Sequence, residues 1–193
     1  MPGKQAKILG SQDIRRALRL IRHHRHPERD ACLFLLSLKA GLRAGEIAGL
    51  TYPMILAADG SLGKTIELHD AVAKKRSGRI IPIHPLLRKA LLRYMRMSDC
   101  TGPVIRSERG DDEPMSAKSI VNWFTQLYRE LGLRGASSHS GRRTFITLAA
   151  RRLHLAGASL HDVQQLAGHR SLNMTARYIQ GDAPAQRRLV HAL

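Results

Sequence analysis

Several basic side chains and one tyrosine in this sequence could form an anion pocket with a hydroxyl group beside it. The basic ones lie next to a turn or at the start of a predicted helix: Arg43, Lys74 with Lys75, His139, Arg142 and His169. Tyr178 follows His169 by nine residues. Guanidinium groups bind phosphate oxygens in pairs. Because the sequence has no acidic cluster suited to Mg²⁺, phosphoryl transfer here would depend on Arg, Lys and His for electrostatic stabilisation.

Each of these residues also has an ordinary structural interpretation. A loop arginine or lysine in a basic protein is typically a solvated cation, a His-x-x-Arg pair can mark a helix surface, and a tyrosine near the end of a chain can serve packing. No single residue therefore predicts a site, whereas their convergence in the fold would.

The charge balance favours a polyanionic partner. The chain has 193 residues, with 32 Lys and Arg against 15 Asp and Glu, which gives a formal net charge of +17. A protein of this charge attracts nucleic acid, since binding releases condensed counterions. The alternative is a basic protein that adheres to many partners. Hydrophobic residues make up 43% of the chain, which excludes a disordered tail.

Other sequence features exclude several protein classes. No apolar run approaches the roughly 20 residues that a membrane crossing requires, and the N-terminus lacks the apolar stretch of a signal peptide. Cys32 and Cys100 show no metal or redox spacing, so we expect a reduced, cytoplasmic protein. The run HHRH at 23–26 fits no common zinc site; we expect a solvated helix end there, and Trp123 in a core or an interface.

The spacing of apolar residues predicts a mostly α fold with a small antiparallel β-sheet, in the α+β class. We expect helices over 11–24, with Ser11 as N-cap, then over 30–40, within 41–50, and over 86–97, 116–131, 140–153, 159–167, 171–179 and 184–193. Strands are expected in KTIEL and RIIPIH, joined by the basic turn AKKRSG. Because no linker divides the chain, we expect a short tail over 1–10 and a single domain over 11–193.

Four segments resemble motifs of the tyrosine recombinase (phage integrase) family, in the order of that family. GLRAGEIAGL resembles its first arginine motif, and AKKRSGRIIPIH its β-hairpin lysine region. SHSGRRTFITLAA resembles its His-x-x-Arg box, and LAGHRSLNMTARYI its closing motif with the nucleophilic tyrosine. The segments span residues 41–179. The resemblance implies the catalytic-domain fold of that family and a site-specific DNA recombinase that needs no metal, cofactor or ATP.

Residue by residue, the resemblance implies a division of labour. Tyr178 would attack the scissile phosphate and form a 3′-phosphotyrosyl bond, while Arg43 and Arg142 would hold the non-bridging oxygens. Lys74 would protonate the departing 5′-oxygen, with Lys75 as the other candidate, and His139 would assist proton transfer at the tyrosine.

The remaining assignments are supporting ones. His169 would hydrogen-bond the phosphate, and Glu46 would support Arg43 from behind, unless it is an exposed helix carboxylate. Four basic residues are expected at the DNA backbone: Lys75, Arg76, Arg143 and Arg170; a structural role is the alternative for Arg143.

The chain also departs from the family pattern. Because the first arginine motif begins at residue 41, we expect this chain to lack the N-terminal DNA-clamping domain of many integrases. A stand-alone small recombinase and a fragment or relic of a longer integrase both stay open. The C-terminal LVHAL segment could dock onto a neighbouring protomer or fold back on its own domain.

The resemblance implies double-stranded DNA at specific sites as the partner, and a homotetramer on synapsed DNA, although the chain alone can be a monomer in solution. It implies a bacterial or phage-encoded, nucleoid-associated protein with no membrane contact. Two alternative functions are a type IB topoisomerase and a DNA-binding regulator that has lost strand exchange.

Overall fold

The protein, described here from a computed structural model, folds mainly into helices around one two-stranded sheet. The structure describes residues 5–73, 77–108, 112–178 and 190–191. The elements are α1 (Ser11–Ile21), α2 (Pro27–Lys39), α3 (Ala44–Ala48), β1 (Thr65–Leu68), β2 (Arg79–Pro82), α4 (Pro85–Met95), α5 (Ala117–Glu130), α6 (Ser140–Arg152), α7 (Leu160–Ala167) and α8 (Leu172–Ala176), with short 3₁₀ turns at Tyr52–Met54 and Leu153–Ala156. The predicted fold class is confirmed.

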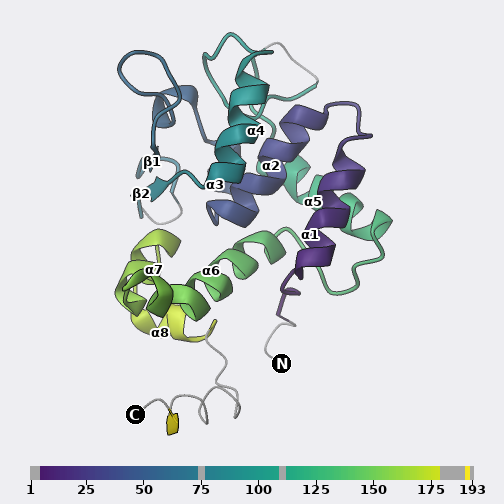
Figure 1. The fold of residues 1–193 in the computed structure, drawn as a ribbon. Coiled ribbons are helices and arrows are strands. Elements are labelled where there is room, and N and C mark those ends of the chain that lie inside the picture. Colours follow the sequence, from purple (N-terminus) through teal and green to yellow (C-terminus); the bar gives the residue numbers. More distant parts are fainter. Residues whose placement is uncertain (1–4, 74–76, 109–111, 179–189, 192–193) are drawn as a thin grey trace.

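Helix α2 lies at the centre of the molecule, as Figure 1 shows. Its sequence is apolar on nearly every side, and Leu33, Phe34 and Leu36 are fully buried. A helix that is apolar all round is stable only inside a core. α2 accordingly packs against α4 and α6 and also contacts α1 and α3.

The sheet is an antiparallel hairpin at the edge of this body. Ile66 of β1 is opposite Ile81 of β2, and Leu68 is opposite Arg79. Ile66, Leu68 and Ile81 are buried while Ile80 is exposed, as the alternation of side chains along a strand requires. The expected turn between the strands includes residues 74–76, which lie outside the described residues.

A second, smaller apolar cluster holds the part of the molecule that follows α6. It contains Ile146 and Ala150 from α6, and Val163 and Ala167 from α7, with Tyr178 packed at its edge. In Figure 1, α7 and α8 lie together at the far end of α6 from α5. The tyrosine is therefore carried by a small unit that rests mainly on one helix and on β2.

Several predicted helix boundaries are wrong by a few residues. Gly10, and not Ser11, is the N-cap of α1, with its backbone N–H donating to the Asp13 carboxylate at 3.2 Å. Helix α2 begins at Pro27 rather than residue 30, because proline suits a first helical turn that has no partner for its N–H groups. Helix α8 ends at Ala176, so Tyr178 lies in the turn that follows it.

The segment before α1 is tied to the body. The backbone N–H of Lys7 donates to the Gly135 carbonyl at 2.8 Å, and that of Leu9 donates to the Thr144 hydroxyl at 2.8 Å. Leu9 is itself buried. Residues 5–10 therefore run beside the start of α6. Across the described ranges, the structure contains no helix that is both long and apolar enough to span a membrane.

The HHRH run contacts two carboxylates at the α1–α2 junction. The His24 ring lies 2.8 Å from the Asp30 carboxylate, and His26 lies 3.2 Å from that of Glu108. Trp123 donates its indole N–H to Asp30 at 3.1 Å and packs edge-on against Phe124. The HHRH run and Trp123 therefore join α5 to the start of α2. The described residues include no group of three or more His, Cys, Asp or Glu that could hold a metal ion.

Candidate active site

Most of the site residues predicted from the sequence line one cleft. It has a volume of about 410 Å³, and it lies between the N-terminal segment, the starts of α3 and α6, and the α7–α8 region. Its walls are formed by Gln5, Ala6, Arg43, Ser137, His139, Arg142, Arg143, His169, Met174, Arg177 and Tyr178. Five of the six expected catalytic candidates are in this set. Lys74, together with Lys75 and Arg76, lies outside the described residues.

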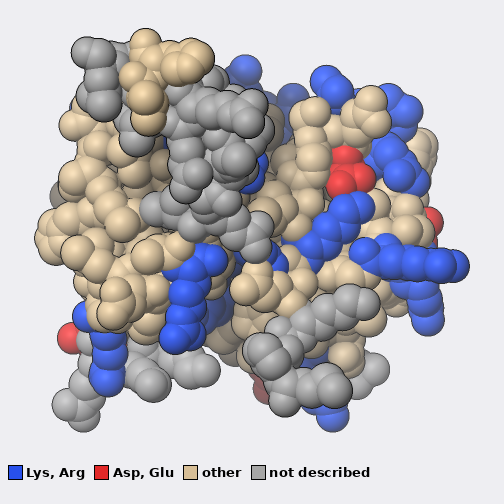
Figure 2. All heavy atoms as spheres, turned by 90° about the horizontal axis from the view of Figure 1, so that it is seen from below, with Lys and Arg blue, Asp and Glu red and all other residues tan. Residues whose placement is uncertain are grey.

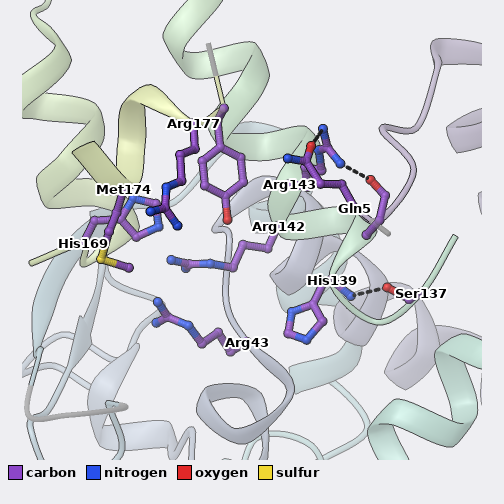
Figure 3. A pocket seen from close by; sticks show the side chains of 11 residues that line it. Gln5, Arg43, Ser137, His139, Arg142, Arg143, His169, Met174 and Arg177 are labelled. Atoms are coloured by element: carbon purple, nitrogen blue, oxygen red, sulfur yellow. Dashed lines mark hydrogen bonds between the residues drawn. The ribbon is translucent and has the colours of Figure 1, made fainter. Parts of the chain in front are cut away.

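Arg43 lies at the N-cap of α3 and is held by Glu46. Its backbone N–H donates to one carboxylate oxygen of Glu46 at 2.9 Å, and its Nη1 donates to the other at 2.6 Å. Gly41 makes the preceding turn possible, because its φ of +65° is a left-handed conformation and an added Cβ would lie 2.5 Å from Phe145. In Figure 3 the guanidinium of Arg43 points into the cleft.

Glu46 is a buried carboxylate rather than an exposed one, with 1% of its surface accessible. Burial alone would raise its pKa, but hydrogen bonds and charge from Arg79 and Arg43 outweigh that effect and lower the pKa to about 2. The carboxylate is therefore ionised at neutral pH and orients Arg43.

Arg142 enters the cleft from the third residue of α6. Its Nη1 donates to the Gly41 carbonyl at 2.6 Å and its Nη2 to the Ala167 carbonyl at 2.5 Å. These bonds use two of the five N–H donors of the group and fix its plane between α3 and α7. Burial, followed by the charge of Arg43, lowers the Arg142 pKa to about 9, which still leaves it positive at pH 7.

His169 follows Gly168, the left-handed C-cap of α7, with φ of +59°. The Nδ1 of His169 lies 3.0 Å from the Thr175 hydroxyl on α8, so the ring is held on that side. Burial first, and then the charge of Arg142, lower its pKa to about 4. The ring is therefore neutral at pH 7 and can donate one hydrogen bond without carrying charge.

Tyr178 is partly buried and lies against His169. The two rings are stacked, with centroids 5.5 Å apart and an interplanar angle of 24°. The backbone N–H of Tyr178 donates to the Thr175 carbonyl at 2.9 Å, which continues the turn of α8. Tyr178 thus shares one cleft with Arg43, Arg142 and His169.

His139 is the exposed N-cap of α6, three residues before Arg142. Its backbone N–H donates to the Ser137 hydroxyl at 3.3 Å. The two residues line the same cleft, as the spacing predicts, yet Arg142 is buried while His139 faces solvent. Figure 3 places the His139 ring across the cleft from His169 and Met174.

The other basic residues separate into two environments. Arg143 donates from Nη1 to the Ala6 carbonyl at 2.7 Å and from Nη2 to the Gln5 side chain, so it holds the N-terminal segment against α6. Arg170 lies outside this cleft, in an adjoining groove between β2 and α7 that includes Arg79. Figure 2, seen from below Figure 1, shows several groups of Lys and Arg on this face and few Asp or Glu.

Besides Gln5, Ala6 and Ser137 of the cleft wall, sequence reasoning missed Met174, Arg177 and Arg79. Met174 and Arg177 line the cleft from α8 and from the turn after it, which the helical spacing around Tyr178 could have indicated. Arg79, the first residue of β2, bonds the back of Glu46 at 3.1 and 2.9 Å. A strand residue beside a buried carboxylate has no sequence signal, because the two are brought together only by the fold.

Comparisons with known proteins agree with the four motifs. The chain is 28% identical over 157 residues to tyrosine recombinase XerC of Rickettsia prowazekii, a match that covers 79% of this chain and 47% of that protein. It is 30% identical over 162 residues to XerC of Rhodospirillum centenum, covering 80% and 43%. The chain thus spans about half the length of these curated relatives.

Solved structures share the fold. A Tn1549 transposon integrase in complex with a circular intermediate DNA superposes with a TM-score of 0.74 at 20% identity, covering 100% of this chain and 67% of that one. The XerA recombinase gives a TM-score of 0.72 at 20% identity, covering 100% and 65%. The model of the phage integrase family matches residues 7–184, so the chain belongs to the phage integrase family.

Proposed function

We propose that this chain cleaves and rejoins DNA at specific sites through a covalent bond to Tyr178. The observation that carries this proposal is the single cleft in which Arg43, Arg142, His169 and Tyr178 meet. Two oriented guanidinium groups beside a hydroxyl form a site for a phosphodiester, and the relatives that the chain resembles are named as recombinases. Residues 11–193 would act as one catalytic domain.

The chemistry follows from the positions of these groups. The Tyr178 oxygen attacks the phosphorus, a P–O bond to tyrosine forms, and the bond from phosphorus to the 5′-oxygen breaks. A tyrosine hydroxyl has a pKa near 10, so its proton must leave as attack occurs. We assign that proton to His139, which is exposed on the cleft wall. The departing 5′-oxygen takes a proton from Lys74, an assignment that rests on the hairpin motif alone.

Charge builds on the non-bridging oxygens in the transition state. Arg142 is fixed by two backbone carbonyls and Arg43 by Glu46, so neither must reorganise when that charge appears. His169, neutral at pH 7, donates a hydrogen bond to the same phosphate. The phosphotyrosyl bond conserves the energy of the broken phosphodiester, so attack by a 5′-hydroxyl reverses the step without ATP.

The partner in this proposal is double-stranded DNA, with four protomers on two synapsed sites for strand exchange. The net charge of +17 supports strong electrostatic binding. Lys75, Arg76 and Arg170 are proposed contacts to the DNA backbone, while the bonds of Arg143 to residues 5 and 6 favour a structural role for it. A DNA substrate in a bacterial cell or phage infection implies action at the nucleoid, in the cytoplasm.

The test is to trap the intermediate on a nicked suicide substrate taken from the ends of the genetic element that encodes the protein. The wild-type chain should form an adduct that survives denaturation and maps to Tyr178. Tyr178→Phe should bind the DNA equally well and form no adduct. Tyr94→Phe is the matched control, because Tyr94 is a partly buried tyrosine on α4 that does not line the cleft.

The outcomes separate the alternatives. With a supercoiled plasmid that carries two sites as the second substrate, exchanged strands support recombination, whereas relaxed circles alone support a topoisomerase. Binding with no adduct in the wild type supports a DNA-binding regulator or an incomplete fragment. An adduct that persists in Tyr178→Phe would show that the nucleophile is another residue.

A further inference from the structure

Arg79 lies behind the cleft, in contact with the carboxylate that holds Arg43. Its side chain is 5% exposed. Its Nη1 and Nη2 donate to the two oxygens of Glu46 at 3.1 and 2.9 Å, and its Nε donates to the Leu166 carbonyl at 2.9 Å. The guanidinium therefore links the hairpin to α3 and to the end of α7.

Two guanidinium groups share one carboxylate at this point. Glu46 accepts two bonds from Arg43 and two from Arg79, and all three side chains are largely buried. The formal charge of the trio is +1. With Arg79 removed it would be zero, and the pair of Arg43 and Glu46 would be internally neutralised, leaving Arg43 little net charge for an anion.

We propose that Arg79 is a positioning residue that balances the charge of Glu46, so that Arg43 can direct its positive charge to a phosphate group in the cleft. This inference deepens the proposed function and rests on it for the identity of that phosphate. Arg79 itself lines the adjoining groove and not the cleft, so it acts on an anion in the cleft without contacting it, chiefly through Glu46.

The electrostatics of the neighbouring groups agree with this role. The charge of Arg79 is one of the causes, after burial, that lower the pKa of Arg142 and of His169, so its field reaches both sides of the cleft. Its side chain also fills the space behind Gly168, where an added Cβ would lie 3.0 Å from Nη1. Arg79 therefore supports the turn that presents His169.

A double-mutant cycle tests charge balance directly. The proteins are wild type, Arg79→Gln, Glu46→Gln and the double variant, and the probe is inorganic phosphate, followed by NMR shifts of the His169 ring. Arg79→Gln should bind phosphate about tenfold more weakly, the size expected when one partly screened unit charge is lost. The double variant restores a formal charge of +1, so its affinity should return to within about threefold of wild type.

A merely structural role gives a different pattern. If Arg79 only fills space, the losses of phosphate affinity caused by the two substitutions will add, and the double variant will bind phosphate more weakly than either single variant. Arg79→Lys keeps the charge but loses the bond to Leu166, so it should retain most of the phosphate affinity. Arg88→Gln is the matched control, because Arg88, like Arg79, donates to the backbone of another segment, with bonds of 2.6 and 3.0 Å to two carbonyls, but lines neither the cleft nor the groove.

The phosphate measurement is independent of DNA cleavage. Rates of adduct formation on the nicked substrate should rank the four proteins in the same order. If the wild type forms no adduct, the proposed recombinase function fails, while the phosphate cycle still decides the role of Arg79. If Arg79→Gln does not fold, recovery of folding and phosphate binding in the double variant supports charge balance. An unchanged affinity in Arg79→Gln, or no recovery in the double variant, overturns the proposal.

Discussion

Replacement of Gly141 by alanine tests how closely α6 must approach α2. An added Cβ would lie 2.4 Å from the Ser37 hydroxyl, 3.0 Å from the Ser37 Cβ and 3.1 Å from its backbone carbon. The hydroxyl can rotate away, but the other two atoms belong to the rigid central helix. Helix α6 must therefore move by several tenths of an ångström to accept the methyl group.

The expected cost is that of overpacking a well-filled core, about 1–3 kcal/mol in the free energy of unfolding. With a urea m-value of about 2 kcal/mol/M, the unfolding midpoint should fall by roughly 0.5–1.5 M. Urea titration followed by circular dichroism measures this shift. Gly45→Ala is the matched control, since nothing lies within 4 Å of its added Cβ and alanine favours a helix, so its midpoint should stay the same or rise.

A functional effect should accompany the loss of stability. Gly141 precedes Arg142, whose guanidinium is fixed by bonds of 2.6 and 2.5 Å to two carbonyls on other elements. Moving the start of α6 lengthens those bonds, so adduct formation should slow even in buffer without urea, where the variant is folded. An activity equal to wild type would show that Arg142 follows the helix without strain.

Ser37→Ala provides a second check. Among the described residues the buried Ser37 hydroxyl has no hydrogen-bond partner, so removing it should be close to neutral or slightly stabilising. Combined with Gly141→Ala it should recover part of the lost stability, because the contacts at 3.0 and 3.1 Å remain. A urea midpoint for Gly141→Ala that equals the wild-type value would refute the steric argument altogether.

Three further results are expected. Burial lowers the pKa of His169 from 6.5 to about 4, so on acidification the unfolded chain takes up this proton before the folded chain does. Relative to His169→Gln, the free energy of unfolding of the wild type should therefore fall by up to about 3 kcal/mol as the pH drops from 6.5 to 4. A difference in urea midpoints that does not change with pH would contradict this. Arg143→Gln removes two hydrogen bonds to the N-terminal segment, so limited proteolysis within residues 5–10 should accelerate while the core stays resistant; equal cleavage rates would argue against that link. Thiol reagents should modify Cys100 in the native protein and spare Cys32, because Cys32 is fully buried and burial raises the pKa of its thiol. Mass spectrometry of the labelled protein measures which cysteine reacts.

The sequence was sufficient to predict the elements and most of the cleft. Apolar spacing located the central helix α2, and turn glycines located Arg43 and His169, because both signals are local. The choice of Arg142 over Arg143 also followed from spacing, and the structure places Arg142 in the buried position and turns Arg143 toward residues 5 and 6. The roles of these residues in catalysis stay predictions.

Contacts between distant segments could not be predicted from local pattern. Glu46 was open to an exposed interpretation, but it is buried and accepts hydrogen bonds from Arg79, 33 positions along the chain. The expected tail at residues 1–10 gave no sign of the bonds that residues 5–10 make to Gly135 and Thr144. Such pairs lack a periodic signature, since they arise only when segments far apart in the sequence pack together.

The separate apolar cluster around α7 has a consequence for how the protein can change over time. Ile146, Ala150, Val163 and Ala167 bury far less surface than the core around α2, so opening this unit requires only part of the free energy of global unfolding. Substitutions there can alter how often Tyr178 is seated beside the arginines, while the body keeps its thermal stability. The rate of the proposed strand transfer and the stability of the fold can therefore vary separately in this chain.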